Sequence, residues 1–125
     1  MKTALNPSTV PRSPFYAQGI DVTARRLVFV SGQVGVTPDD TPLDGVEAQT
    51  RQAIANVAAV LAEAGLTPAS IVKQTIYLTD PADIPGFLAG ASESVTDDPP
   101  ATTMLIVAAL ADPSLKVEIE AIAAG

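Results

Sequence analysis

The architecture of this chain is decided by the stretch Leu27-Val-Phe-Val-Ser-Gly-Gln-Val34. Its β-branched and aromatic residues favour an extended strand. Because successive side chains of a strand point to opposite faces, Leu27 and Phe29 share one face and the three valines share the other. A strand that is apolar on both sides requires that both faces of its sheet be covered.

The segments around this strand are expected to form a single domain over residues 1–125. Residues 16–22 are predicted to be a strand that forms a hairpin with residues 27–34 through the polar turn Thr23-Ala-Arg-Arg26. The N-terminal segment 1–14 is predicted to be irregular, because prolines stand at positions 7, 11 and 14.

Two helices are predicted farther along the chain. The first runs from Asp44 or Gly45 to Ala64, because apolar residues recur at helical intervals and Gly65 is a suitable stop. The second follows the N-cap pair Asp80-Pro81. A proline and two glycines inside it disfavour helix, so its first turn is expected to be distorted or to start later. Its apolar face comprises Ile84, Phe87, Leu88, Ala91 and Val95.

Further strands are predicted over residues 70–78, 102–109 and 116–123, which gives a β-β-α-β-α-β-β order and an α+β fold with a mixed sheet. Two helices cannot cover both faces of a sheet of five or six strands. The face without helices is therefore expected to pack against identical chains.

Histidine and cysteine are both absent from the chain. Proton transfer at neutral pH must therefore use Glu, Asp, Tyr or Lys. The same absence excludes thiolate and Ser-His mechanisms and zinc sites built from Cys and His.

The formal net charge is −7, and the seven Lys and Arg residues form no basic stripe. Such a surface repels phosphate backbones, so nucleic acid is not an expected partner. No stretch has the pattern of a signal peptide or approaches 18 consecutive apolar residues, so we expect no membrane span and a cytoplasmic location.

Chemistry is expected on the strand Val117-Glu-Ile-Glu-Ala-Ile-Ala123. Glu118 and Glu120 share one face, and the other face is formed by Val117, Ile119, Ala121 and Ala123. One interpretation is an amphipathic surface strand with solvated glutamates. The other is that the end of the strand lines a cleft, where a carboxylate acts as a general acid or base. The strand alone leaves both open.

Several motifs, in matching order and spacing over nearly the whole chain, resemble the Rid family, also called the YjgF/YER057c/UK114 family. They are Pro14-Phe-Tyr-Ala-Gln-Gly19, Leu27 to Val34, Gln49-Thr-Arg-Gln-Ala-Ile-Ala-Asn56, Ile71-Val-Lys-Gln-Thr75, Pro100-Ala-Thr-Thr-Met-Leu-Ile-Val107 and Glu118-Ile-Glu-Ala-Ile122. The resemblance implies a chorismate-mutase-like fold, a homotrimer with ligand pockets between subunits, and hydrolysis of enamines and imines such as 2-aminoacrylate. It implies no metal and no organic cofactor.

Carried over by position, Glu118 matches the water-orienting glutamate of the family. Ser31 and Gly32 match its Ser-Gly turn at the pocket wall, and Tyr16 matches its pocket tyrosine. Each match has a structural alternative. The motif Ser31-Gly32 would also simply end a strand, and Tyr16 would also serve as a core or interface aromatic.

Three positions depart from the family pattern. In the usual Pro-Ala-Arg-Ser/Thr motif the arginine binds a substrate carboxylate. Here the motif reads Pro100-Ala101-Thr102-Thr103, so Thr102 stands at the position of the arginine. A threonine hydroxyl carries no charge, so the carboxylate clamp is lost; both threonines would equally be ordinary strand residues. Leu88 replaces a frequent asparagine and Met104 a frequent cysteine, which makes the predicted ligand pocket more apolar.

Two functions therefore remain open. The first is an imine or enamine hydrolase (deaminase) that acts on a neutral or weakly polar small molecule, with Glu118 activating water. The second is a homotrimer without catalytic activity that binds a small metabolite or protects another protein. Lys73 would need desolvation or a second cation to act as a Schiff-base nucleophile, and the sequence shows neither.

Overall fold

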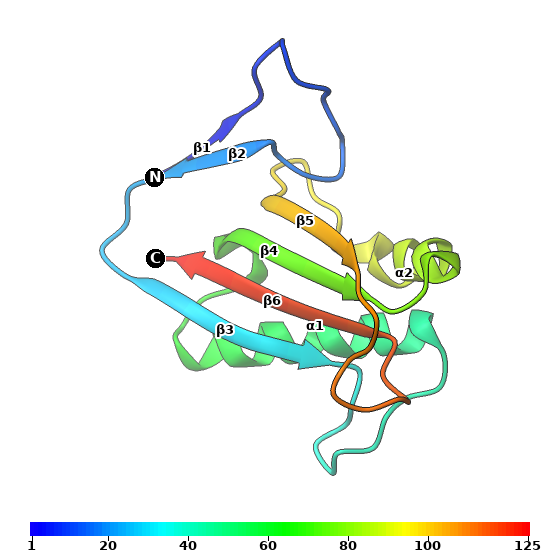
Figure 1. The fold of residues 1–125 in the computed structure, drawn as a ribbon. Coiled ribbons are helices and arrows are strands. Elements are labelled where there is room, and N and C mark those ends of the chain that lie inside the picture. Colours follow the sequence, from blue (N-terminus) through cyan, green and yellow to red (C-terminus); the bar gives the residue numbers. More distant parts are fainter.

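The computed structural model describes residues 1–125 as six strands and two α-helices (Figure 1). The main sheet has four strands in the order β3-β6-β4-β5, and β1 and β2 form a separate ribbon. The predicted α+β class is confirmed. The elements are β1 (Lys2–Leu5), β2 (Gly19–Val22), β3 (Leu27–Val34), α1 (Val46–Glu63), β4 (Ile71–Leu78), α2 (Ile84–Ala91), β5 (Ala101–Ile106) and β6 (Val117–Ala124).

The last strand in the sequence, β6, lies in the middle of the main sheet. It pairs antiparallel with β3 on one side and with β4 on the other, whereas β5 runs parallel to β4. The sheet is therefore mixed, and β3 and β5 are its two edges.

The predicted hairpin between residues 16–22 and 27–34 was wrong. Strand β2 pairs with β1, so Lys2–Leu5 is a strand within the segment 1–14 that was expected to be irregular. The physical reason is that both ends of the connection Thr23–Arg26 are already paired elsewhere. The Thr23 N–H donates to the Met1 carbonyl, and Arg26 exchanges backbone hydrogen bonds with Gly125.

The first helix is confirmed nearly at its predicted bounds. Gly45 is its N-cap and Gly65, at φ 72°, follows its C-cap. Ala53, Val57 and Leu61 are buried on the face that α1 turns toward β3 and β6. This periodic stripe is what binds the helix to the sheet.

The second helix starts late, as expected. Asp80 caps a short 3₁₀ turn over Pro81–Asp83, and α2 begins only at Ile84. The predicted apolar face was wrong for Leu88 and Val95, which are exposed. Val95 lies beyond the end of α2. For Leu88, the glycines of α2 explain the difference, because they let the α2 backbone lie against α1, and this contact selects the buried face.

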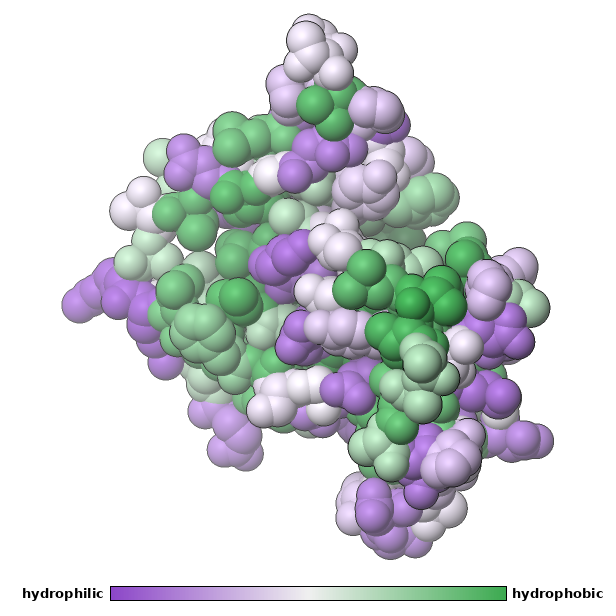
Figure 2. Space-filling model, viewed as in Figure 1, coloured by the Kyte–Doolittle hydropathy of each residue, from purple (hydrophilic) through white to green (hydrophobic).

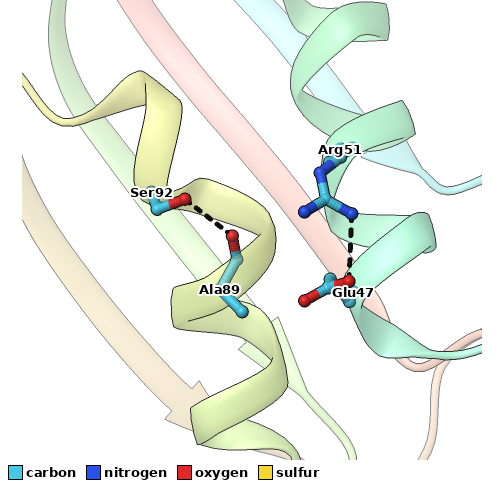
Figure 3. Close-up of polar contacts among 4 residues, drawn as sticks. All are labelled: Glu47, Arg51, Ala89 and Ser92. Atoms are coloured by element: carbon cyan, nitrogen blue, oxygen red, sulfur yellow. Dashed lines mark hydrogen bonds and ion pairs between the residues drawn. The ribbon is translucent and has the colours of Figure 1, made fainter.

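A Cβ on Gly90 would lie 2.6 Å from the carbonyl oxygen of Glu47 and 2.8 Å from Thr50 Cβ. Figure 3 shows the two helices side by side, each with one local polar contact. In α1, Arg51 pairs with Glu47 at 3.1 Å, and near the end of α2 the Ser92 hydroxyl donates to the Ala89 carbonyl at 2.9 Å.

The core lies between the two helices and one face of the main sheet, and its twelve buried residues include Phe87 of α2. We call the opposite face the helix-free face; Figure 1 looks onto it. On its β3 side, Phe29 is 69% and Leu27 52% exposed. Figure 2 shows this face as hydrophilic over the middle strands, with hydrophobic areas on either side. No helix of the chain is long and apolar enough to cross a bilayer.

Candidate functional site

The side chain of Glu118 lies on the helix-free face of β6, half-buried, between Val34 of β3 and Tyr77 of β4. Its neighbours Val117 and Ile119 point to the opposite face and are buried in the core, so the predicted alternation along the strand is confirmed. The Glu118 carboxylate makes no hydrogen bond or ion pair with any other group of the chain.

A bulge in β3 makes room for this carboxylate. The β3–β6 register shifts between Val30 and Gln33, so Ser31 and Gly32 lie in the irregular stretch. Gly32 lies directly beneath Glu118, and a Cβ there would overlap the Glu118 carboxylate. Ser31 is exposed. The structure thus brings Glu118, Ser31 and Gly32 together on the helix-free face, and their role at a pocket wall stays a prediction.

The second glutamate of β6 has a different environment. The Tyr77 hydroxyl donates to Glu120 Oε1 at 2.6 Å. This hydrogen bond, assisted by partial desolvation and by the negative charges of Glu120 and Glu118, raises the pKa of Tyr77 above its ordinary value. Glu120 is therefore engaged with the neighbouring strand, whereas Glu118 is free.

The two threonines predicted to bind ligand lie on opposite faces of the sheet. Thr103 is on the helix-free face, where the ammonium of Lys73 donates to its hydroxyl at 2.7 Å. Thr102 is on the helix side, where its hydroxyl accepts from the Gln74 amide at 3.1 Å and donates to the Pro100 carbonyl at 3.2 Å. The one hydroxyl proton of Thr102 is thus already used within the chain.

The remaining predicted residues lie on β5, beside its start, and on α2. Met104 is two residues farther along β5 and packs against the core. Leu88, on α2, is 46% exposed. Tyr16 precedes Ala17, whose backbone N–H donates to the Pro100 carbonyl at 3.1 Å, so Tyr16 lies beside the start of β5.

Apart from Thr103, the predicted site residues therefore form two groups within one chain. The first group, on the helix-free face of β3 and β6, contains Ser31, Gly32 and Glu118. The second group, at the β5 edge and on α2, contains Tyr16, Leu88, Thr102 and Met104. The sheet separates Glu118 from Thr102, because Glu118 and Tyr77 share the helix-free face while Thr102 and Gln74 share the other.

The loops around the first group are held by Gln49 of α1, which is only 1% exposed. Its side-chain amide donates to the carbonyls of Leu43 and Ser114, each at 2.9 Å. Its carbonyl accepts from the backbone N–H of Lys116 at 2.8 Å, two residues before Glu118. A single buried amide thus fixes the start of β6.

Reasoning from sequence missed the hydroxyl partner Tyr77 and the clamp Gln49. The alternation Lys73, Thr75, Tyr77 along one strand does indicate that Tyr77 shares a face with Lys73. No pattern in the sequence indicates that Gln49 reaches two loops, the one before α1 and the one before β6. No three acidic side chains come close enough together to hold a metal ion.

The chain is similar in sequence to proteins of one family. The Endoribonuclease L-PSP family model matches residues 9–125. The 2-iminobutanoate/2-iminopropanoate deaminase of Escherichia coli strain K12 is 37% identical over 113 residues, which cover 86% of this chain and 85% of that protein. A RutC family protein of Aquifex aeolicus is 44% identical over 72 residues, so the match spans only 57% of this chain and 55% of that relative.

The fold is shared as well. The crystal structure of YyfB from Yersinia pestis, described as a conserved Rid family protein of unknown function, has a TM-score of 0.86 and 34% identity, with 98% of each chain covered. Fold, family model and full-length sequence similarity agree, and the chain belongs to the Endoribonuclease L-PSP family, also known as the Rid or YjgF/YER057c/UK114 family.

Proposed function

We propose that this protein hydrolyses carbon–nitrogen double bonds of small imines or enamines, with Glu118 as the general base. The observation that carries the proposal is the Glu118 carboxylate itself, which is half-buried above Gly32 and has no hydrogen-bond partner in the chain. A positioned carboxylate with free oxygens can orient a water molecule and accept its proton. The deaminase name of the Escherichia coli relative supports the same reaction class.

In the proposed reaction, an enamine substrate reacts as its imine tautomer. Water adds to the carbon of the protonated imine as Glu118 takes one of its protons, which breaks the C=N π bond and forms a neutral carbinolamine. Glu118 returns this proton to the nitrogen and takes the hydroxyl proton as the C–N bond breaks. A carbonyl product leaves together with ammonia or an amine, which accepts the last proton from Glu118. The reaction consumes one water molecule and requires no oxidant or reductant. The exposed hydroxyl of Ser31 is the nearest predicted group that could hold the substrate nitrogen or oxygen.

We further propose that the complete site forms between copies of this chain in a homotrimer. The two groups of site residues lie on different faces of one sheet, so a second copy is needed to bring Thr102, Met104 and Leu88 opposite Glu118. The exposed Leu27 and Phe29 on the helix-free face supply apolar surface for that contact. A closed cyclic assembly would cover this face in every copy.

The expected substrate is neutral or weakly polar. Thr102 offers neither a charge nor a free proton, because its hydroxyl donates to Pro100 and accepts from Gln74. An arginine at this position would offer a permanently charged, two-pronged donor to a carboxylate. The apolar side chains of Leu88 and Met104, on the same side of the sheet, also favour a neutral or weakly polar substrate.

The second candidate is a homotrimer that binds a metabolite, or protects another protein, without catalysing a reaction. The observation that favours it is that three polar positions of the family pattern are replaced together, at Thr102, Leu88 and Met104. RNA cleavage is not proposed, because a chain of net charge −7 without histidine offers neither a phosphate track nor the usual proton-transfer group.

Replacement of Glu118 by Gln separates the two candidates. With a panel of neutral aldimines and ketimines, the loss of imine absorbance is expected to slow at least about a hundredfold in Glu118→Gln, because general base catalysis is removed. Ligand affinity, measured with the carbonyl product, is expected to persist. The matched control Glu93→Gln changes an exposed glutamate elsewhere and should keep full activity. A parent protein that binds ligand but turns over no imine of the panel would support the binder instead.

Thr102→Arg tests the substrate class. The new guanidinium supplies the missing carboxylate partner, so hydrolysis of imines derived from amino acids is expected to rise at least about tenfold relative to neutral imines. The control is Thr3→Arg, at an exposed position of β1. A well-folded variant whose preference between the two substrate classes is unchanged would show that residue 102 does not face the substrate.

A further inference from the structure

An open depression of about 310 Å³ lies on the helix-free face, next to the first group of site residues but extending away from Glu118. Its floor is formed by strands β3, β6 and β4. Phe29 and Ile122 provide its apolar wall, and its polar wall carries both a cation and a carboxylate. The lining residues are Phe29, Val30, Ser31, Lys73, Gln74, Thr75, Glu120, Ala121 and Ile122.

The two charges of this depression, Lys73 and Glu120, do not neutralise each other. They lie on neighbouring strands, because Glu120 is opposite Thr75 in the β4–β6 register. Yet the two ion pairs of the structure, Lys2 with Asp98 and Arg51 with Glu47, lie elsewhere. Each of the two charges is bonded instead to a neutral hydroxyl.

Both hydroxyl contacts leave bonding capacity toward the depression. The ammonium of Lys73 uses one of its three protons on Thr103 at 2.7 Å. Glu120 accepts from Tyr77 through Oε1 at 2.6 Å, and its second oxygen has no partner. The depression thus contains a separate cation and anion, and each can form further hydrogen bonds.

We propose that this depression binds a small zwitterion, namely an α-amino acid with an apolar side chain. Its carboxylate would accept from Lys73 and from the Ser31 hydroxyl, its ammonium would donate to the free oxygen of Glu120, and its side chain would lie against Phe29 and Ile122. Ser31 borders both this depression and the proposed hydrolase site, but Glu118 does not line the depression, so the proposed ligand binding does not require the general base.

The presence of both charges is what selects a dipolar ligand. A simple carboxylate would be attracted by Lys73 but repelled by Glu120. A simple amine would be attracted by Glu120 but repelled by Lys73. A zwitterion satisfies both groups at once by charge-assisted hydrogen bonds. If copies of the chain cover the helix-free face, the two charges lose solvent, and a ligand that pairs with both is expected to bind more tightly.

Calorimetric titration of the full chain tests the ligand class with three related probes. L-Leucine carries both charges, 4-methylpentanoate lacks the ammonium group, and 3-methylbutan-1-amine lacks the carboxylate. L-Leucine is expected to bind at least about tenfold more tightly than either of the others, because each lacks one charge-assisted contact. Equal affinity for the three probes, or no heat of binding with millimolar leucine, would overturn the proposal.

Side-chain variants test the assigned partners. Lys73→Met and Glu120→Gln are each expected to weaken leucine binding by about tenfold or more. Lys73→Arg keeps the charge and should retain most of the affinity, which distinguishes lost binding from lost folding. Lys116→Met and Glu93→Gln are matched controls on exposed residues outside the depression. Unchanged affinity in the folded Lys73→Met and Glu120→Gln variants would refute the site.

The same titration separates this site from the hydrolase site. Glu118→Gln is expected to lose imine hydrolysis and to keep leucine binding, whereas Lys73→Met is expected to lose leucine binding. Failure of the hydrolase proposal would leave the leucine result intact. Loss of leucine binding in Glu118→Gln would instead mean that the two sites are one.

Discussion

At the scale of single residues, Glu118 and Glu120 show how two equal side chains on one strand acquire different roles. They lie on the same face of β6 and are separated by one residue, but only Glu120 has a hydroxyl partner, Tyr77. Glu118 instead lies over the bare backbone of Gly32. The partner strands, and not the glutamates themselves, decide which carboxylate is free to act.

Gly32→Ala tests this arrangement. The new Cβ would overlap the Glu118 carboxylate, which is the far end of a flexible side chain and can move aside. We therefore expect stability against urea to change little, while imine hydrolysis falls by about a hundredfold because the base is displaced by an ångström or more. Gly19→Ala, where the nearest atom is 3.6 Å away, is the control and should change neither property. Full activity in Gly32→Ala would show that the position of Glu118 is not critical.

At the scale of elements, the contact between α1 and α2 depends on glycines that would otherwise weaken a helix. A Cβ at Gly86 would lie 2.5 Å from Val46 Cγ1, and Gly90 faces the α1 backbone even more directly. The same residues that lower the helix propensity of α2 permit its close packing, and Thr50 is fully buried beside them.

Gly90→Ala separates these two effects. Helix propensity alone predicts a gain of about 1 kcal/mol. The crowding of the new methyl group against Glu47 and Thr50 predicts instead a loss of about 1–3 kcal/mol in the free energy of unfolding. Urea unfolding decides between them, and a variant more stable than the parent would mean that the helices are not in close contact.

How well each element could be predicted depends on how local its determinants are. The bounds of α1 follow from a repeated apolar stripe between two glycines, all within twenty residues of sequence. The partner of β2 could not be predicted in this way. Lys2–Leu5 has no distinctive pattern, and the choice between β1 and β3 as a partner is made by long-range pairing.

The same limit applies to the candidate site. The alternation of β6 predicted correctly that Glu118 and Glu120 share a face. The sequence motif that contains Thr102 gave no indication that this residue and Glu118 lie on opposite faces of the sheet. That placement depends on the parallel register of β5 on β4, which sets Thr102 beside Gln74.

At the scale of the whole molecule, the helix-free face determines how the protein is expected to associate. Phe29 is the most exposed large side chain of this face, at 69%. We predict that Phe29→Asp prevents assembly, because a buried charge without a partner is costly in an apolar contact.

Light scattering coupled to gel filtration measures this effect directly. The parent is expected to have a mass three times that of the 12.8 kDa chain, and Phe29→Asp the mass of one chain. Val60→Asp, at a valine of α1 that is 39% exposed, is the control and should remain a trimer. A parent of single-chain mass would contradict the proposed assembly and the shared site with it.

The central position of β6 has a consequence for biosynthesis. Strands β3 and β4 are not neighbours; both pair with residues 117–124. While the nascent chain emerges from the ribosome, neither strand can complete its ladder until residues 117–124 have left the exit tunnel. Formation of the main sheet therefore waits for β6, and it must close loops of about forty residues or more, which slows it. Until β6 inserts, β3 and the edge of β4 that faces away from β5 lack their partner and stay open to chaperones and to aggregation.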